Sequence, residues 1–144
     1  MQSVTSGAVR VCKKESARLM KTIIGIDVGG STTKICGFRG DKLLEPLLVK
    51  ATDPVASVYG GFGKFTAQNG ISLADIDRVM ITGVGSAYIS EDIYGITTQH
   101  VSEFVSTGRG GLYLTGIGEA IIVSMGTGTA LVHAKGKNIE YLGG

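Results

Sequence analysis

Short apolar runs separated by glycine-rich turns dominate the first part of the chain. An apolar run at residues 22–27 (TIIGID) leads into the turn VGGST, and a second run follows at 33–38 (TKICGF). RGDK at 39–42 predicts a hairpin turn, and residues 43–50 predict a third strand, in which Pro46 favours an edge position or a bulge. The chain therefore opens with antiparallel strands, unlike the strand–helix–strand start of a Rossmann fold.

The pattern changes to helical spacing after Asp53, which is a favourable N-cap and is followed by Pro54. Gly70 predicts the end of this helix. The apolar positions that fall on one helical face are Val55, Val58, Phe62 and Phe65.

The rest of the chain alternates short strands with turns and one further helical segment. A buried strand is expected at 78–82, before the glycine-rich turn GVGSAYI, and a short strand within 96–104. Helical turns follow at about 103–111. A hairpin with the tight turn MGTGT and a last strand at 138–142 complete the pattern, which predicts an α/β fold.

Composition narrows the class of protein. Of 144 residues, 43% are hydrophobic and 18% charged, which is typical of a globular domain. The 23 glycines indicate many tight turns, and a net charge of +2 without a basic patch gives no indication of a nucleic-acid partner. No apolar stretch is long enough to span a bilayer. The two cysteines suggest neither a disulfide framework nor a metal site, so we expect a cytoplasmic protein.

The two ends of the chain differ from its middle. Residues 1–20 contain basic residues but lack the apolar core of a secretory signal, so we expect an extension that is disordered or not native. The domain is then expected at 21–144. Because the chain ends on Gly143 and Gly144 directly after a strand, we expect a glycine-rich turn that has been truncated.

The segment GIDVGGSTTK carries the first candidate chemistry. Asp27, at the end of a strand, is suited to hold Mg²⁺ through water, because Mg²⁺ keeps much of its hydration shell. Lys34 can offer a positive charge to a phosphoryl group. The turn between them supplies backbone N–H groups and hydroxyls for phosphate oxygens, from Gly29, Gly30, Ser31, Thr32 and Thr33. A plain hairpin with a capping aspartate is the structural alternative.

Two more segments carry candidate residues. SMGTGTA is a second glycine–hydroxyl turn between apolar runs, and a triphosphate clamp needs two sides; its candidate residues are Gly126, Thr127, Gly128 and Thr129. Glu103 begins a predicted helix, where it could accept a proton from a substrate hydroxyl. A solvated glutamate that favours the helix dipole is the more common case.

Together these segments resemble type II pantothenate kinases, within the superfamily of acetate and sugar kinases and actin. The resemblance extends from about Lys21 to Gly144 and rests on GIDVGGSTTK, MITGVGSAYI, VSEF and IIVSMGTGTALVHAKGKNIEYLGG. It implies the N-terminal half of an actin-like (ribonuclease H-like) ATPase domain, with a mixed sheet that opens with antiparallel strands.

The resemblance also implies a reaction, in which ATP and pantothenate give 4′-phosphopantothenate and ADP, the first step towards coenzyme A. It implies Asp27 as the residue associated with magnesium, Lys34 as the lysine of the first phosphate loop, and Glu103 as the general base. Gly29 and Gly30 would belong to that first loop. The second phosphate turn would contain Gly126, Thr127 and Gly128, and the full-length protein would be a homodimer.

Two positions depart from the family pattern. Val105 stands where an acidic residue often follows the glutamate, and Tyr141-Leu142 precedes the final glycines where many members carry a substrate-binding arginine. A fragment of this kind is expected to be weakly active or inactive. The alternatives are an ATPase activator of a 2-hydroxyacyl-CoA dehydratase, another enzyme similar to sugar kinases such as N-acetylglucosamine kinase, and a non-catalytic nucleotide-binding module.

Overall fold

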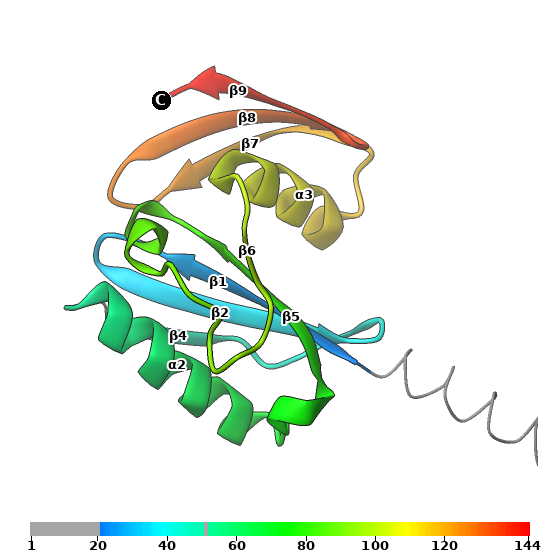
Figure 1. Cartoon of the computed structure of the whole chain (residues 1–144). Coiled ribbons are helices and arrows are strands. Elements are labelled where there is room, and N and C mark those ends of the chain that lie inside the picture. The colour runs from blue at the N-terminus through cyan, green and yellow to red at the C-terminus, as the bar shows by residue number, and fades with distance from the viewer. Residues whose placement is uncertain (1–20, 51) are drawn as a thin grey trace, which may run out of the picture.

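The protein is built in layers, in the order helix, sheet, helix, sheet (Figure 1). The structure is a computed structural model that describes residues 21–50 and 52–144; the predicted extension, residues 1–20, lies outside the described residues. Helix α2 (Pro54–Gln68) covers one face of a six-stranded sheet. Helix α3 (Glu103–Thr115) lies between that sheet and a three-stranded sheet.

The larger sheet is mixed, as predicted. Its strands run in the order β3-β2-β1-β5-β6, and β4 also pairs with β2. Strand β1 is antiparallel to β2 and parallel to β5. The strands are β1 (Thr22–Val28), β2 (Thr32–Arg39), β3 (Lys42–Leu43), β4 (Leu47–Lys50), β5 (Ile76–Thr82) and β6 (Thr98–His100). Short 3₁₀ helices, η1 (Leu73–Asp75) and η2 (Val84–Tyr88), flank β5.

The main core lies between α2 and this sheet. The helix begins at the Asp53 cap, whose side chain accepts a hydrogen bond from the Ala56 amide at 2.7 Å. Phe62 and Phe65 then pack, fully buried, against alternate residues of β1 such as Ile26. The predicted helical face is correct except at its start, because Val55 is 42% exposed in the first turn of the helix.

The single strand predicted at 43–50 is wrong, since the chain leaves the sheet between β3 and β4. Leu44 turns inward and is buried in the core, while its amide donates to the Gly37 carbonyl at 2.8 Å. The Asn69 side chain then holds the backbone of Glu45 on both sides, accepting from its N–H and donating to its C=O, each at 3.1 Å. Pro46 has no N–H to donate, which fits an interruption in the ladder.

The smaller sheet is antiparallel and packs on α3. It contains β7 (Glu119–Met125), β8 (Thr129–Lys135) and β9 (Asn138–Gly143) in that order. Helix α3 is capped by Ser102 and extends to Thr115, one turn beyond the predicted end. A Cβ at Gly111 would lie 2.6 Å from Ile122 Cγ1, so only glycine allows this close approach of helix and sheet. No helix in the described part of the chain is long and apolar enough to cross a membrane.

Candidate functional site

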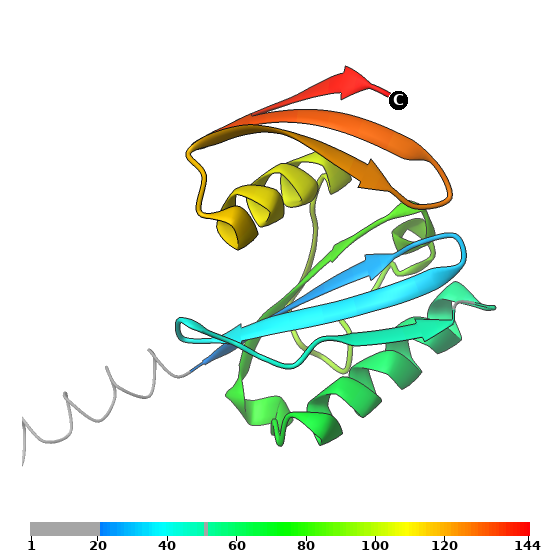
Figure 2. The ribbon, with the colours of Figure 1, turned by 180° about the vertical axis from the view of Figure 1, so that it is seen from behind.

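The two glycine-rich turns lie side by side at one end of the molecule. Figures 1 and 2 show the β1–β2 turn and the β7–β8 turn next to each other, although they are far apart in the sequence. A Cβ built on Gly30 would lie 3.5 Å from Thr127 Oγ1. The fold therefore brings together the two segments that the sequence singled out as phosphate turns.

Each turn presents polar groups to the outside. In the first, the Gly29 amide donates to the Thr32 carbonyl at 3.0 Å, and Gly30 and Ser31 are exposed at the tip. In the second, the Gly126 amide donates to the Gly128 carbonyl at 2.8 Å. The exposed residues of this second turn are Gly126, Thr127, Gly128 and Thr129. The Gly29 and Gly126 amides are used to close the turns, so the groups open to a ligand belong to the exposed tip residues and include the hydroxyls of Ser31, Thr127 and Thr129.

Asp27 and Lys34 form an ion pair at the base of the first turn. They are cross-strand neighbours in the β1–β2 ladder, and Lys34 Nζ donates to Asp27 Oδ2 at 2.8 Å. Their side chains are 33% and 53% exposed, respectively, so solvent weakens the attraction and a ligand can reach both groups. A carboxylate and an ammonium group beside two N–H-rich turns suit a phosphate with its counter-cation.

Two residues that the sequence did not single out, Thr82 and Gly83, stand next to Asp27. Thr82 faces Asp27 across the parallel β1–β5 pair, and its buried hydroxyl has no hydrogen-bond partner among the described residues. Gly83 has φ of +89°, and a Cβ there would lie 2.5 Å from Asp27 Oδ1. The glycine directly after the predicted strand 78–82 was the only local signal, and it indicated a turn and not a contact with Asp27.

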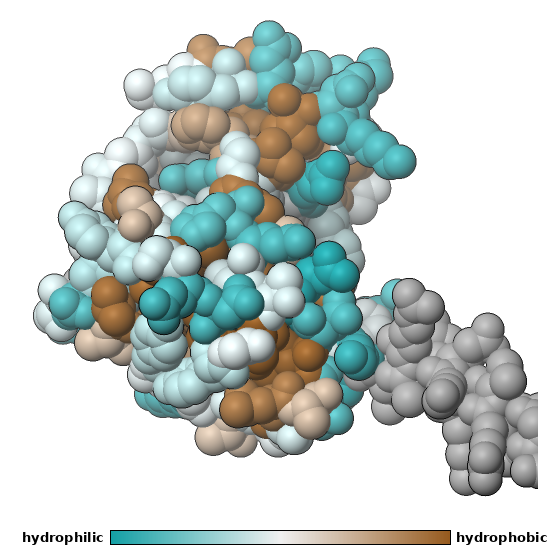
Figure 3. Space-filling view, viewed as in Figure 1, coloured by the Kyte–Doolittle hydropathy of each residue, from teal (hydrophilic) through white to brown (hydrophobic). Residues whose placement is uncertain are grey.

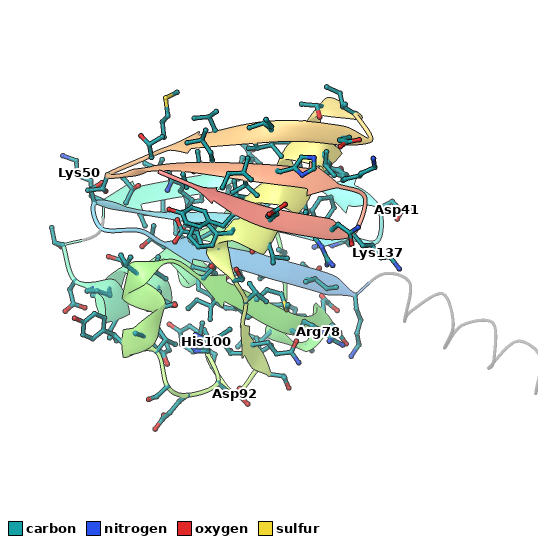
Figure 4. All side chains as sticks on the ribbon, turned by 90° about the horizontal axis from the view of Figure 1, so that it is seen from above. Asp41, Lys50, Arg78, Asp92, His100 and Lys137 are labelled. Atoms are coloured by element: carbon teal, nitrogen blue, oxygen red, sulfur yellow. The ribbon has the colours of Figure 1, made fainter. Side chains whose placement is uncertain are left out.

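Lys50 is a second cation at this end that the sequence did not single out. It lies opposite Thr32 in the β2–β4 ladder. Figure 4 shows Lys50 at one end of the molecule, with Asp41 and Lys137 at the opposite end. Its exposed side chain adds positive charge near the first turn.

Glu103 is the first residue of α3, and it is exposed. Ser102 caps the helix by accepting from the Val105 amide at 3.5 Å. The N-terminal end of α3 faces the same end of the molecule as the two turns (Figure 1). Ser106, one helical turn after Glu103, lines the cavity described next, whereas Glu103 does not. Glu103 therefore lies near the cavity but outside its wall.

A cavity of about 460 Å³ extends from Asp27 and Lys34 over the face of the large sheet that is turned towards α3. Loss of contact with water raises the pKa of the Cys36 thiol above its ordinary value. A hydrogen bond with the Gly25 backbone lowers this pKa, but by less. The residues that line the cavity are mainly apolar and include Cys36, Leu48, Met80 and Val101.

Solved structures share this fold. The chain resembles component A of the (R)-2-hydroxyglutaryl-CoA dehydratase of Acidaminococcus fermentans, with a TM-score of 0.69, 16% identity, and coverage of 84% of this chain and 47% of that one. It also resembles the activator of the 2-hydroxyisocaproyl-CoA dehydratase of Clostridium difficile with bound ADPNP, with a TM-score of 0.64, 16% identity, and 85% and 46% coverage. The ROK hexokinase of Thermus thermophilus gives a TM-score of 0.61, 13% identity, and 82% and 47% coverage.

These likenesses show the fold and nothing finer. No protein-family profile matches the sequence, and no curated protein matches it. The chain spans about half the length of the solved structures named above. The predicted actin-like, sugar-kinase ATPase fold is confirmed, and the chain has the fold of that superfamily's ATPase domains.

Proposed function

We propose that the two turns bind the phosphates of ATP, and that the protein transfers the γ-phosphoryl group to pantothenate. The observation that carries the proposal is the approach of Gly30 to Thr127, with the Asp27–Lys34 pair at the base of the first turn. A triphosphate needs donors on more than one side, and the two turns offer them.

The residues of the site fit a magnesium ion held through water. Asp27 supplies a carboxylate, and beside it lies the buried hydroxyl of Thr82, for which the described part of the chain offers no hydrogen-bond partner. The described residues contain no group of three or more His, Cys, Asp or Glu side chains that could hold a metal directly, and Mg²⁺ with nucleotide commonly needs only one or two carboxylates. Bound there, Mg²⁺ would neutralise charge on the phosphates.

Glu103 is the proposed general base. The primary hydroxyl of pantothenate would attack the γ-phosphorus, its proton would pass to the Glu103 carboxylate, and ADP would leave with the bridging oxygen. Lys34 would neutralise charge on the transferred group. The position of Glu103 near the cavity supports this role, because the acceptor would enter beside Asp27.

Pantothenate as acceptor is supported by the four sequence segments that resemble type II pantothenate kinases. Of the two departures, Val105 directly follows the VSEF segment, and Tyr141-Leu142 lies within the last segment. Phe104 and Tyr141 stack with ring centroids 4.1 Å apart, so Tyr141 has a packing role in the Tyr141-Leu142 pair, where many members of the family carry an arginine before two glycines. We further propose a cytoplasmic location and a homodimeric full-length protein.

The first test is ATP binding by calorimetry with and without Mg²⁺. Lys34→Ala is expected to weaken binding about tenfold or more, because it removes a charge-assisted contact. Lys42→Ala is the matched control, since Lys42 is exposed on β3 away from both turns. If Lys34→Ala and Lys42→Ala weakened ATP binding equally, the proposed phosphate site would be wrong.

The second test is phosphorylation of pantothenate. The turnover of this chain is expected to be weak, and Glu103→Gln is expected to abolish it while ATP binding stays unchanged. Binding of ATP with no detectable transfer would favour a non-catalytic nucleotide-binding module instead.

A dehydratase activator is the second candidate, because the chain shares its fold with the activator of the 2-hydroxyisocaproyl-CoA dehydratase, at a TM-score of 0.64. In such a protein, cysteines would bridge an iron–sulfur cluster between subunits. The chain has only Cys12 and Cys36, and Cys36 lines the cavity within β2. Anaerobic purification followed by iron analysis tests this candidate, and a brown protein with stoichiometric iron would favour it over the kinase.

A further inference from the structure

We propose that Lys50 is a second cation for the terminal phosphate of the nucleotide, and that it makes the site prefer a triphosphate to a diphosphate. This inference rests on the proposed phosphoryl transfer and deepens it, since it names a residue that selects the nucleotide. Neither the glycine-rich turns nor the Asp27–Lys34 pair explains why a further lysine lies on this part of the large sheet.

Lys50 lies on the same face of the large sheet as Lys34. Side chains alternate between the two faces of a strand, so residues two apart in a strand share a face. Lys34 lies opposite Leu48 in the β2–β4 ladder, and both line the cavity. Thr32 lies opposite Lys50, two residues nearer to the first turn. The two lysines are therefore diagonal neighbours, about 7–8 Å apart along the sheet, and long side chains can meet over this distance.

The two lysines differ in their partners. Lys34 Nζ lies 2.8 Å from Asp27 Oδ2, so the Asp27 carboxylate already offsets the charge of Lys34. The Lys50 side chain is exposed and forms no ion pair with another residue that the structure describes. A triphosphate keeps a net negative charge even with a magnesium ion bound, and it requires a cation that no carboxylate neutralises. An anion between the two lysines also removes the repulsion between their like charges.

The backbone of Lys50 is held in place from the other side of the sheet. Lys50 is the last residue of β4. The Ser57 hydroxyl, which is buried in the first turns of α2, lies 2.6 Å from the Asp53 carbonyl and 3.4 Å from the Lys50 carbonyl. The side chain of Lys50 therefore extends from a fixed origin, as a residue that positions a ligand requires.

The position of the two lysines relative to the cavity identifies the phosphate that they would meet. The transferred phosphoryl group has to lie between the turns, which would hold the nucleotide, and the cavity beside Asp27, where the acceptor would enter. Lys34 lines the cavity, and Lys50 lies nearer to the end of the molecule where both hairpins turn (Figures 1 and 4). Together they would flank the terminal phosphate, which a diphosphate lacks.

Calorimetry of ATP binding and of ADP binding, each with Mg²⁺, tests the inference. Lys50→Met removes the charge and keeps most of the length of the side chain. We expect this variant to bind ATP about tenfold more weakly and ADP with an affinity within about twofold of the original, so that the preference for ATP falls. Lys64→Met is the matched control, since Lys64 is exposed on α2, which covers the opposite face of the sheet. We expect it to leave both affinities unchanged.

Equal weakening of ATP and ADP binding in Lys50→Met would overturn the inference, because a lysine with only a structural role does not distinguish the two nucleotides. Unchanged binding of both would also overturn it and would leave Lys50 as a charge that protects the edge strand β4 from pairing. The proposed function is read separately. An original protein that binds neither nucleotide would contradict the phosphate site and the inference together, whereas ATP binding that depends on Lys34 but not on Lys50 would contradict the inference alone.

Discussion

The hairpins β1–β2 and β7–β8 are built alike but packed differently. Each has a glycine–hydroxyl turn and a cross-strand acid–lysine pair, Asp27 with Lys34 and Glu119 with Lys135. Strand β1 has neighbours on both edges, and α2 covers its inner face. Strand β7 pairs only with β8 among the described strands.

The exposed side of β7 makes the difference visible. Ile121, Val123 and Met125 are 61%, 51% and 82% exposed, and apolar side chains reach the surface of the layer that α3 and the smaller sheet form (Figure 3). Two hairpins of similar sequence design can thus differ in stability, because burial and not the turn sets the strength of each. If both turns bind phosphate, the β1–β2 turn would be the rigid side of the site and the β7–β8 turn the more easily deformed side.

The largest expected effect distinguishes the core between α2 and the large sheet from the packing of the smaller sheet on α3. Phe62→Ala, at 1% exposure under the large sheet, is expected to lower the free energy of unfolding by about 3–5 kcal/mol. Ile122→Ala, on the half-buried face of β7, is expected to cost about 1–2 kcal/mol. Urea unfolding measures both, and equal losses would contradict the difference in packing.

The next effect is a difference between two glycine-to-alanine substitutions, one beside the first turn and one within the second. Gly83→Ala places a Cβ against Asp27 Oδ1 in a backbone conformation that L residues rarely adopt, so we expect a loss of about 1–3 kcal/mol and weaker ATP binding. Gly128→Ala meets no atom within 4 Å, and we expect a change within about 0.5 kcal/mol. Urea unfolding and calorimetry measure the pair. If Gly83→Ala changed neither the free energy of unfolding nor ATP binding, the position of Asp27 would not depend on the close approach of Gly83.

These glycines also show what the sequence could and could not predict. Alternation and turn residues predicted β1, β2 and the two glycine-rich turns, because each of these features depends on residues that are neighbours in the chain. The approach of Gly83 to Asp27 and the Met80 wall of the cavity depend on the pairing of β1 with β5, which no local pattern specifies. Leu44 was assigned to a strand because its turn into the core depends on Asn69, a residue at the far end of α2.

A smaller effect is expected at the exposed edge. An unpaired strand with alternating apolar residues is a site of self-association, which a lysine prevents. Val123→Lys is therefore expected to reduce concentration-dependent association in sedimentation velocity, with unfolding free energy within about 0.5 kcal/mol of the original protein. Val84→Lys, at a 72% exposed position in η2, is the control. A protein that stays monomeric at high concentration before any substitution would contradict this prediction.

The smallest effect concerns the acid–lysine pair of the second hairpin. Glu119 accepts from Lys135 Nζ at 2.8 Å and contacts His133 Nε2 at 2.9 Å. The hydrogen bond from Lys135, and then that from His133, lower the pKa of the Glu119 carboxyl below its ordinary value. Because the pKa is lower in the folded state, the stabilisation is present above the unfolded-state value of about 4.3 and is lost as pH falls through the folded-state value.

Glu119→Gln should therefore unfold more easily than the original protein at pH 6, and the two should converge as pH falls below about 4.3. The difference should be small, since Glu119 is exposed to solvent and screened by it. Glu91→Gln, at an exposed loop position, is expected to show no such convergence. Thermal unfolding between pH 3 and pH 7 measures all three proteins. If the difference in stability between Glu119→Gln and the original protein stayed constant across this range, the charge of Glu119 would not stabilise the β7–β8 hairpin. The packing of the hairpin on α3 would then be its main source of stability.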